Sequence, residues 1–175
     1  MKFSVYQVSR RGGRATNQDR MGYCYTRESA LFALADGLGG HPRGDVAAQL
    51  ALQTIANLFQ QEARPRLRDP QEFLRRSIFR AHEQIQHYAQ EQKLTDSPRT
   101  TVVVCVLQNG AAHWAHVGDS RLYSCAMAPC SRARAIIRIS NNSTRKIRST
   151  VWPCCSRTAR RAICCSPVWG RGSCP

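Results

Sequence analysis

The chain reads ALADGLGGH at residues 33–41. The apolar residues 30–35 predict a short buried strand, and this strand ends in Asp36, which is followed by three glycines within four residues. A carboxylate at a strand end, on backbone that can adopt unusual φ and ψ angles, is a common way to hold a hard metal ion beside main-chain carbonyls. The alternative is a tight glycine-rich turn in which Asp36 only forms the turn. This stretch alone does not decide between the two.

Three strands are predicted around this stretch. Apolar and polar residues alternate over Phe3–Val8, and further strands are predicted at Met21–Thr26 and Ala30–Ala35. Consecutive strands of this kind form a meander, which brings the loop 14–19 close to Asp36.

Two helices are predicted next. Apolar residues recur at helical spacing between Asp45 and Gln61. The tetrapeptide DPQE at 69–72 predicts a second helix start, because Asp can cap, Pro fits the first turn and Glu72 can reach back to the cap. The apolar stripe of this helix consists of Leu74, Ile78, Ala81, Ile85 and Tyr88. His82 and His87 lie off the stripe, so we interpret them as solvated residues rather than metal ligands.

The region after the second helix returns to strand patterns. Residues 100–107 are rich in β-branched side chains, and Asn109-Gly110 predicts a hairpin whose partner strand is 111–117. A tight turn at 118–121 leads into a further strand that starts at 122–123. Strands, then two helices, then strands indicate an α+β fold in which helices cover a largely antiparallel sheet.

Charge and cysteine are unevenly distributed along the 175 residues. All 11 acidic residues lie between Asp19 and Asp119, so residues 1–124 hold 16 basic against 11 acidic residues, a net charge of +5. Residues 125–175 hold ten basic residues and no acidic ones, together with seven of the nine cysteines. A high isoelectric point ordinarily suggests nucleic-acid binding, but here most of the excess charge belongs to the tail, so the two parts are interpreted separately.

The sequence contains no signal for a membrane or for export. Residues 1–14 lack the apolar segment of a signal peptide, and the longest apolar run, 102–107, is too short to span a bilayer. We therefore expect a cytoplasmic protein without a membrane partner.

Three short motifs complete the pattern. They are Arg14-x-x-Asn17-Gln18-Asp19, Asp36-Gly37 and Gly118-Asp119-Ser120-Arg121, together with the strand that Thr100-Thr101 opens. Each motif is weak alone, but their order and content over residues 3–123 resemble the metal-dependent protein phosphatases, the PPM or type 2C serine/threonine phosphatases, in their bacterial stand-alone form. The chemistry suits these residues, because metal-bound carboxylates and a bidentate arginine are what phosphomonoester hydrolysis needs.

The resemblance implies a role for each matching residue. Arg14 matches the arginine that holds the substrate phosphate, although a solvated loop arginine is the alternative. Asp36 matches the aspartate that bridges two metal ions, and Gly37 the residue that lends a backbone carbonyl. Asp119 matches the aspartate of a weaker third metal site, or else only forms a turn. A further pair of residues, which orient metal-bound water, is matched by Gln18 and Asp19.

The same resemblance implies the fold, cofactors and partners. It implies an α-β-β-α sandwich, here truncated after its N-terminal part, with two Mn²⁺ or Mg²⁺ ions. Phosphorylated Ser/Thr proteins would be the substrates, and a cognate protein kinase a partner. Thr100 and Thr101 match a structural strand and receive no catalytic role.

The family pattern ends after Tyr123. The family needs later aspartates in Asp-Gly and Asp-Asn motifs to complete the metal site, and residues 125–175 contain no aspartate. We expect this basic, cysteine-rich tail to be a frameshift product without a native fold, because Cys-Cys-Ser at 154–156 and 164–166 becomes Leu-Leu-Leu in GC-rich codons read one base earlier. The cysteines lack the paired CxxC spacing of a zinc site, and a disulfide framework does not suit a chain without a signal peptide.

Three functions follow from these observations. The first is a metal-dependent protein serine/threonine phosphatase, with residues 1–124 as the N-terminal part of its domain, impaired or inactive because later carboxylates are missing. The second is a non-catalytic phosphoprotein-binding module that keeps Arg14. The third is a basic nucleic-acid-binding protein acting through 125–175, which the lack of a recognisable module disfavours.

Overall fold

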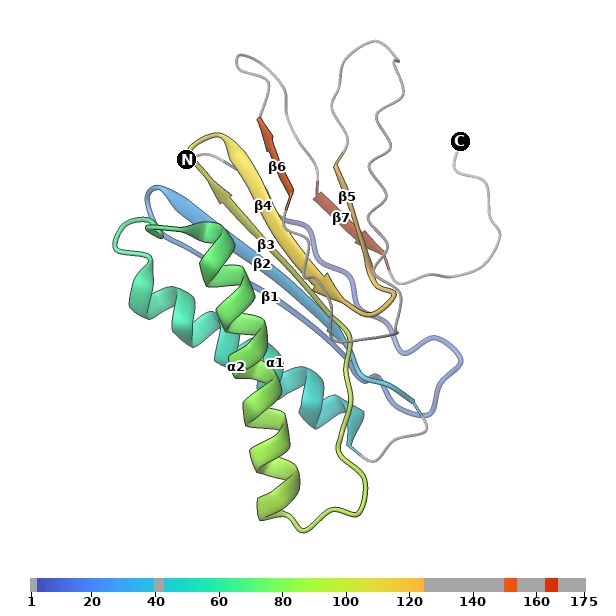
Figure 1. The fold of residues 1–175 in the computed structure, drawn as a ribbon. Helices are drawn as coiled ribbons and strands as arrows, with labels where there is room; N and C mark the ends of the chain where they lie inside the picture. The colour runs from blue at the N-terminus through green and yellow to red at the C-terminus, as the bar shows by residue number, and fades with distance from the viewer. Residues whose placement is uncertain (1–2, 40–42, 125–149, 154–162, 167–175) are drawn as a thin grey trace.

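The computed structural model describes residues 3–39, 43–124, 150–153 and 163–166. A five-stranded sheet in the order β1-β2-β3-β4-β6 carries two long helices on one face (Figure 1). Every recorded strand pairing is antiparallel. The sheet strands are β1 (Asp19–Tyr25), β2 (Ser29–Asp36), β3 (Val102–Gln108), β4 (Ala111–Val117) and β6 (Thr150–Pro153). The helices are α1 (Gly44–Glu62) and α2 (Pro70–Glu91). The predicted α+β class is confirmed.

The core lies between the helices and the sheet. Strand β2 turns Leu31, Ala33 and Ala35 toward the helices, and β3 contributes alternate valines. Helix α1 contributes the small, fully buried side chains of Ala47, Ala48 and Ala51, which are followed along the helix by the larger Ile55 and Phe59. Small residues at the start of α1 let the helix approach the end of β2 closely, and this is the end that carries Asp36.

Helix α2 begins and packs largely as its sequence predicts. Asp69 accepts hydrogen bonds from the backbone N–H groups of Gln71 (2.9 Å) and Glu72 (3.1 Å), and Pro70 occupies the first turn. The expected return contact from Glu72 to the cap is wrong, because both carboxylate oxygens of Glu72 accept hydrogen bonds from Arg75 instead (2.6 and 2.9 Å).

The histidines of α2 face solvent. Both His82 and His87 are exposed, and His87 Nδ1 lies 3.5 Å from Glu91 Oε1 on the same helix. The predicted stripe is buried at Leu74, Ile78, Ala81 and Ile85, and Tyr88 at its end is half-buried.

The β3–β4 hairpin is confirmed with its predicted turn. Asn109 and Gly110 adopt φ angles of 52° and 70°, and a two-residue turn with positive φ at both central positions matches the twist of the strands it joins. The partner strand runs over Ala111–Val117 as predicted, whereas β3 begins at Val102, two residues later than expected.

The predicted first strand at Phe3–Val8 is wrong, because this segment forms no strand. Phe3 instead packs edge-to-face on Tyr25 and Phe32, with ring centroids 5.6 and 5.8 Å away. These rings lie on the sheet face away from the helices, since Tyr23 and Phe32 are opposite each other in the ladder while Leu31 and Ala33 face the helical core. Aromatic packing accounts for Phe3 at the start of this segment, whereas Tyr6 and Val8 are exposed.

A second, two-stranded sheet pairs β5 (Arg121–Ser124) with β7 (Ile163–Ser166). The strand predicted from 122–123 is therefore present. Strands β6 and β7 are the only parts of the 125–175 tail that the structure describes, and the expectation of a tail without native fold otherwise lies outside the described residues. Of the helices described, neither is long and apolar enough to cross a membrane.

Candidate functional site

A cavity of about 650 Å³ lies where β1 begins and β2 ends. Its walls come from the N-terminal loop, the turn after β2, the start of β3 and the β4–β5 turn. All six residues selected from the sequence motifs line it, namely Arg14, Gln18, Asp19, Asp36, Gly37 and Asp119. The structure thus brings together side chains that are more than 100 positions apart in the sequence.

Two carboxylates oppose each other at this cavity. Asp19 is the first residue of β1 and Asp36 the last of β2, and they are directly paired in the antiparallel register. Burial and the neighbouring carboxylates of Asp19 and Asp119 raise the pKa of Asp36 from its ordinary 3.8 to about 6, while Arg14 opposes this shift. A half-buried carboxylate beside other carboxylates favours the binding of a cation.

The backbone of Asp36 is held by the two threonines that precede β3. Thr101 N–H donates to the Asp36 carbonyl at 2.8 Å, and Thr100 Oγ1 donates to the same oxygen at 2.9 Å. An isolated bridge also pairs Gly37 with Thr100. The sequence indicated only a strand here, so the positioning of Asp36 by both threonines is a finding of the structure.

Glycine is required where the turn after β2 meets α1. A Cβ on Gly37 would lie 2.5 Å from the carbonyl oxygen of Gly44 and 2.9 Å from Cβ of Gln18. A Cβ on Gly44 would lie 2.9 Å from Oε1 of Gln18. Gly37 N–H also donates to the Gln18 carbonyl at 3.3 Å. Three segments therefore meet at van der Waals distance, and the contribution of Gly44 was not predicted.

Asp119 is carried by a turn that is fixed to the start of β3. Gly118 adopts a φ of 105°, and a Cβ there would lie 2.6 Å from Thr101. The buried hydroxyls of Thr101 and Ser120 are hydrogen-bonded at 2.7 Å. This pair, which no sequence motif revealed, holds the exposed Asp119 at the cavity rim.

Arg14 is exposed and lies at the rim beside the turn after β2. A Cβ on Gly39 would be 3.4 Å from its guanidinium nitrogen Nη1. Arg10 and Arg11 line the same cavity. Farther along the loop, the side chain of Asn17 accepts a hydrogen bond from Asp19 N–H at 3.0 Å and donates one to Ser9 at 2.7 Å. These two hydrogen bonds order the loop that precedes Asp19.

The donors at the cavity suit a hard divalent cation only in part. Carboxylate oxygens and a nearby main-chain carbonyl are the ligands that Mg²⁺ and Mn²⁺ prefer. Within the described parts of the chain, however, no three His, Cys, Asp or Glu side chains form a group that could hold a metal ion. The cavity therefore supplies some of the ligands of a metal site and not a complete set.

Comparison with known proteins shows to which family the chain is similar. A family model described as Protein phosphatase 2C matches residues 7–168. The chain belongs to the protein phosphatase 2C family. The match extends beyond the residues 3–123 that carry the sequence motifs and continues into the tail.

Individual relatives of this family match over part of their length. The Listeria welshimeri serine/threonine phosphatase stp is 30% identical over 112 residues, which are 63% of this chain and 44% of the relative. The crystal structure of the Staphylococcus aureus serine/threonine phosphatase Stp1 is 29% identical with a TM-score of 0.61, over 70% of this chain and 51% of that one. This chain spans less than half the length of the curated relatives it matches.

A third comparison shows the fold alone. The catalytic domain of the serine/threonine protein phosphatase PstP, solved in complex with two manganese ions, is 22% identical with a TM-score of 0.55. The match covers 88% of this chain and 68% of that domain. Its sheet-and-helix architecture agrees with the predicted type 2C fold, of which this chain supplies a part.

Proposed function

We propose that this chain carries the phosphate-binding half of a metal-dependent protein serine/threonine phosphatase site, and that its own turnover is impaired. The observation that carries the proposal is the pairing of Asp19 with Asp36 beside Arg14 in one cavity. Family membership supports the reaction class. Phosphorylated Ser/Thr proteins of the cytoplasm are the proposed substrates, and the kinase that phosphorylates them the proposed partner.

Each residue has a proposed task that its position supports. Arg14 at the rim binds two phosphate oxygens through its planar guanidinium. Gln18 and Asp19 orient the attacking water by accepting its hydrogen bonds, and Asn17 holds Asp19 in place. Asp36 and the Gly37 carbonyl would hold Mn²⁺ or Mg²⁺, and Asp119 would contribute to a third, weaker site. When bound, a pair of divalent ions neutralises charge on the phosphoryl oxygens and provides a nucleophile at neutral pH.

We infer the impaired turnover from the small number of metal ligands at the site. Sequence motifs with further aspartates are missing after Asp119, and the described residues do not form a three-ligand group. A cation held mainly by Asp36 and a carbonyl is bound weakly, because affinity for hard cations rises with the number of charged ligands. We propose that residues 1–124 are the functional part and that the tail does not complete the site.

The test is a phosphatase assay of the purified 175-residue protein on a phosphothreonine peptide with Mn²⁺ or Mg²⁺. We expect phosphopeptide binding that Arg14→Ala weakens, with turnover close to that of the Asp36→Asn variant. Robust Mn²⁺-dependent turnover that Asp36→Asn abolishes would contradict the impairment but keep the phosphatase assignment. Absence of both binding and turnover would contradict the proposal as a whole.

A second candidate is a non-catalytic phosphoprotein-binding module. It is favoured by the same observation, an arginine-lined cavity without a full ligand set. Tight phosphopeptide binding that is unchanged by EDTA would favour this candidate over an impaired enzyme, since the enzyme site needs the cation to complete its charge balance. The third candidate, nucleic-acid binding through 125–175, rests on residues that lie almost wholly outside the described part of the chain.

A further inference from the structure

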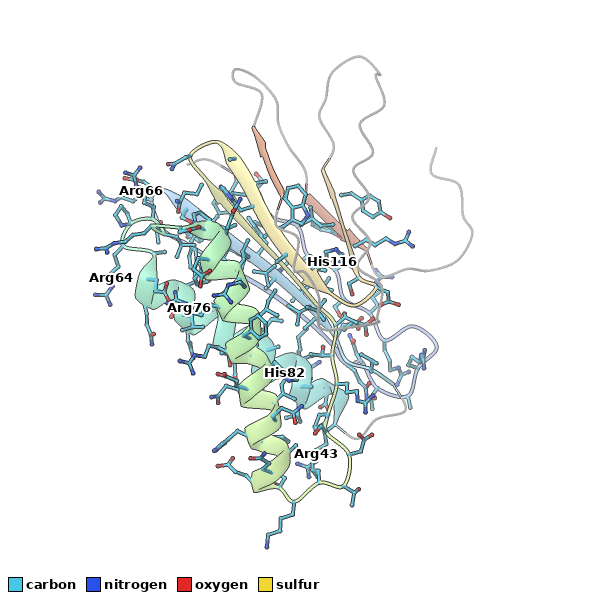
Figure 2. The ribbon with its side chains drawn as sticks, viewed as in Figure 1. Arg43, Arg64, Arg66, Arg76, His82 and His116 are labelled. Carbon is cyan, nitrogen blue, oxygen red and sulfur yellow. The ribbon has the colours of Figure 1, made fainter. Side chains whose placement is uncertain are left out.

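The connection between α1 and α2 carries three arginines in five residues, Arg64, Arg66 and Arg68, which we call the basic loop. It contains no acidic residue. Figure 2 shows Arg64 and Arg66 together at this connection, with their side chains directed outward. A cavity of about 480 Å³ is lined by the basic loop and by Gln108 and Asn109 of the β3–β4 hairpin.

Hydrogen bonds to the β3–β4 hairpin and to the β1–β2 turn hold the backbone of the basic loop in place. Leu67, only 2% exposed, donates its N–H to Oε1 of Gln108 at 2.8 Å and accepts from Nε2 of the same amide at 2.9 Å. The carbonyl of Pro65 accepts a hydrogen bond from Thr26 Oγ1 in the β1–β2 turn. Because the backbone is already ordered, the arginines reach a ligand with little further loss of chain entropy.

The charge of the basic loop is only partly neutralised. Arg66 lies 3.9 Å from Glu28 and donates to Asn109 Oδ1 at 3.5 Å. In the described portion of the chain, no ion pair is recorded for Arg64 or Arg68, and all three arginines are exposed. The nearby Asp69 is occupied as the cap of α2. Three cations on one ordered loop repel one another, and an anionic ligand relieves that repulsion.

The basic loop is remote from the Asp36 cavity. It contacts the end of the sheet where the β1–β2 and β3–β4 turns lie, whereas Asp19 and Asp36 lie at the opposite strand ends (Figure 1). A seven-residue strand separates the two ends by roughly 20 Å. A ligand on the basic loop is therefore distinct from the phosphate at Arg14.

We propose that the basic loop is a docking site for an acidic segment of a partner protein. The ligand chemistry is a run of carboxylates or phosphates on one peptide, which the arginine forks bind bidentately while the exposed amide of Asn109 offers a hydrogen bond. The inference does not depend on the proposed phosphatase activity, since it concerns another end of the molecule.

The experiment uses the full 175-residue chain and a 12-residue glutamate-rich peptide that bears a benzophenone photo-crosslinker. Cleavage after glutamate releases residues 63–72 as one peptide, because Glu62 and Glu72 flank the basic loop. Mass spectrometry of that peptide reports docking directly, whatever the basic tail binds. A glutamine-rich peptide of equal length is the neutral probe.

The test variant is R64Q/R66Q/R68Q, and the matched control is R75Q/R80Q/K93Q, which removes the same charge from exposed positions of α2 and its end. We expect the test variant to lower cross-linking to 63–72 about tenfold and the control less than about twofold, with weaker labelling at higher salt. Arg14→Ala, which changes the other cavity and leaves the basic loop intact, leaves the labelling of 63–72 unchanged. If the triple variant melts early, R68Q alone is expected to lower the labelling by about threefold.

Three outcomes would overturn the proposal. The first is equal labelling of 63–72 in the test and control variants. The second is labelling of that peptide by the neutral probe as strongly as by the acidic one. The third is labelling confined to residues 125–175 or to the segments around Asp36. None of these outcomes bears on the phosphatase assay, so the two proposals fail independently.

Discussion

Asp19 and Asp36 face each other as the terminal pair of the β1–β2 ladder. Their opposition follows from the register of a hairpin whose other pairs place Leu31 against Cys24 in the helix-facing core. A slip of one residue would turn both the core residues and Asp36 to the other face. The packing that stabilises the sheet therefore also determines that two like charges meet at the cavity.

The first prediction concerns pH. Because folding raises the pKa of Asp36 to about 6, the folded state binds this proton more tightly than the unfolded chain. The free energy of unfolding should therefore fall as the pH rises from about 4 to about 6 and stay lower above that range. Asp36→Asn should raise the melting temperature at pH 7.5 by a few degrees and have little effect at pH 3.5.

Thermal melts of both proteins across this pH range measure the effect. Glu83→Gln, at an exposed position of α2, is the control and should leave the pH dependence unchanged. Added Mn²⁺ should stabilise the wild-type protein at pH 7.5 more than the Asp36→Asn variant, since a ligand that binds only the folded state raises its stability. A melting temperature that is lower in Asp36→Asn at pH 7.5 would contradict the electrostatic explanation.

The second prediction concerns Gly37. A methyl group there lies 2.5 Å from the Gly44 carbonyl, so Gly37→Ala should lower the free energy of unfolding by about 1–3 kcal/mol, because overpacking forces the backbone apart. Gly13→Ala is the matched control, since no atom lies within 4 Å of a Cβ at that site. Urea denaturation should show a change within about 0.5 kcal/mol for the control. Equal losses in both variants would exclude the close approach as the cause.

The third prediction concerns the buried hydroxyl pair of Thr101 and Ser120. Thr101→Val and Ser120→Ala each leave one buried hydroxyl without its partner. Each substitution should therefore lower the free energy of unfolding by about 1–3 kcal/mol. The double variant should lose less unfolding free energy than the two single variants together, because neither buried hydroxyl then remains without a partner. A double-mutant cycle from denaturation curves checks this, and strict additivity would show that the hydrogen bond contributes little.

The fourth prediction concerns Arg14. Arg14→Ala should weaken binding of a phosphothreonine peptide roughly tenfold or more, because hydrogen bonds to a charged group contribute about 1.5–3 kcal/mol. Arg14→Lys should recover only part of the loss, since an ammonium lacks the planar fork. Arg75→Ala, on the outer side of α2, is the control for net charge. Titration calorimetry measures all three, and equal affinity of Arg14→Ala and wild type would remove Arg14 from the site.

The fifth prediction concerns the coding DNA. We propose that one base is missing at the junction of Tyr123 and Ser124, so that residues 125–175 are read out of frame. Resequencing source material across this junction should recover the base and restore a reading frame in which the codons of Cys-Cys-Ser at 154–156 and 164–166 are read as Leu-Leu-Leu. An unchanged sequence would mean that the chain is a genuine variant, and its tail would then need a functional account of its own.

Strong periodic signals made most of the described fold predictable. Helix α1 was predicted within one residue of its observed ends, and the Asn109-Gly110 turn with the strand after it was predicted without error. The apolar residues before Asp36 indicated β2 because both of its faces are largely buried. These features depend on local periodicity and turn chemistry, which a single sequence displays directly.

Other features depend on contacts that no local pattern displays. Phe3–Val8 alternates like a strand, but aromatic packing on Tyr25 and Phe32 accounts for the apolar residue at its start. Glu72 stands where a capping box needs it, but Arg75 one turn later binds its carboxylate. The sequence indicated that Thr100 and Thr101 are structural residues. Their hydrogen bonds to the Asp36 carbonyl became visible only in the folded structure.

The two hydrogen bonds between Leu67 and Gln108 tie the connection of the helices to the end of β3. At the other end of the same layer, Gly44 lies directly against Gly37. Helix α1 is therefore held against the sheet at both of its ends and cannot separate from one side without breaking a buried contact. The amide hydrogens of α1 and of β3 should consequently exchange with solvent water together, as one cooperative unit, and more slowly than those of the N-terminal loop.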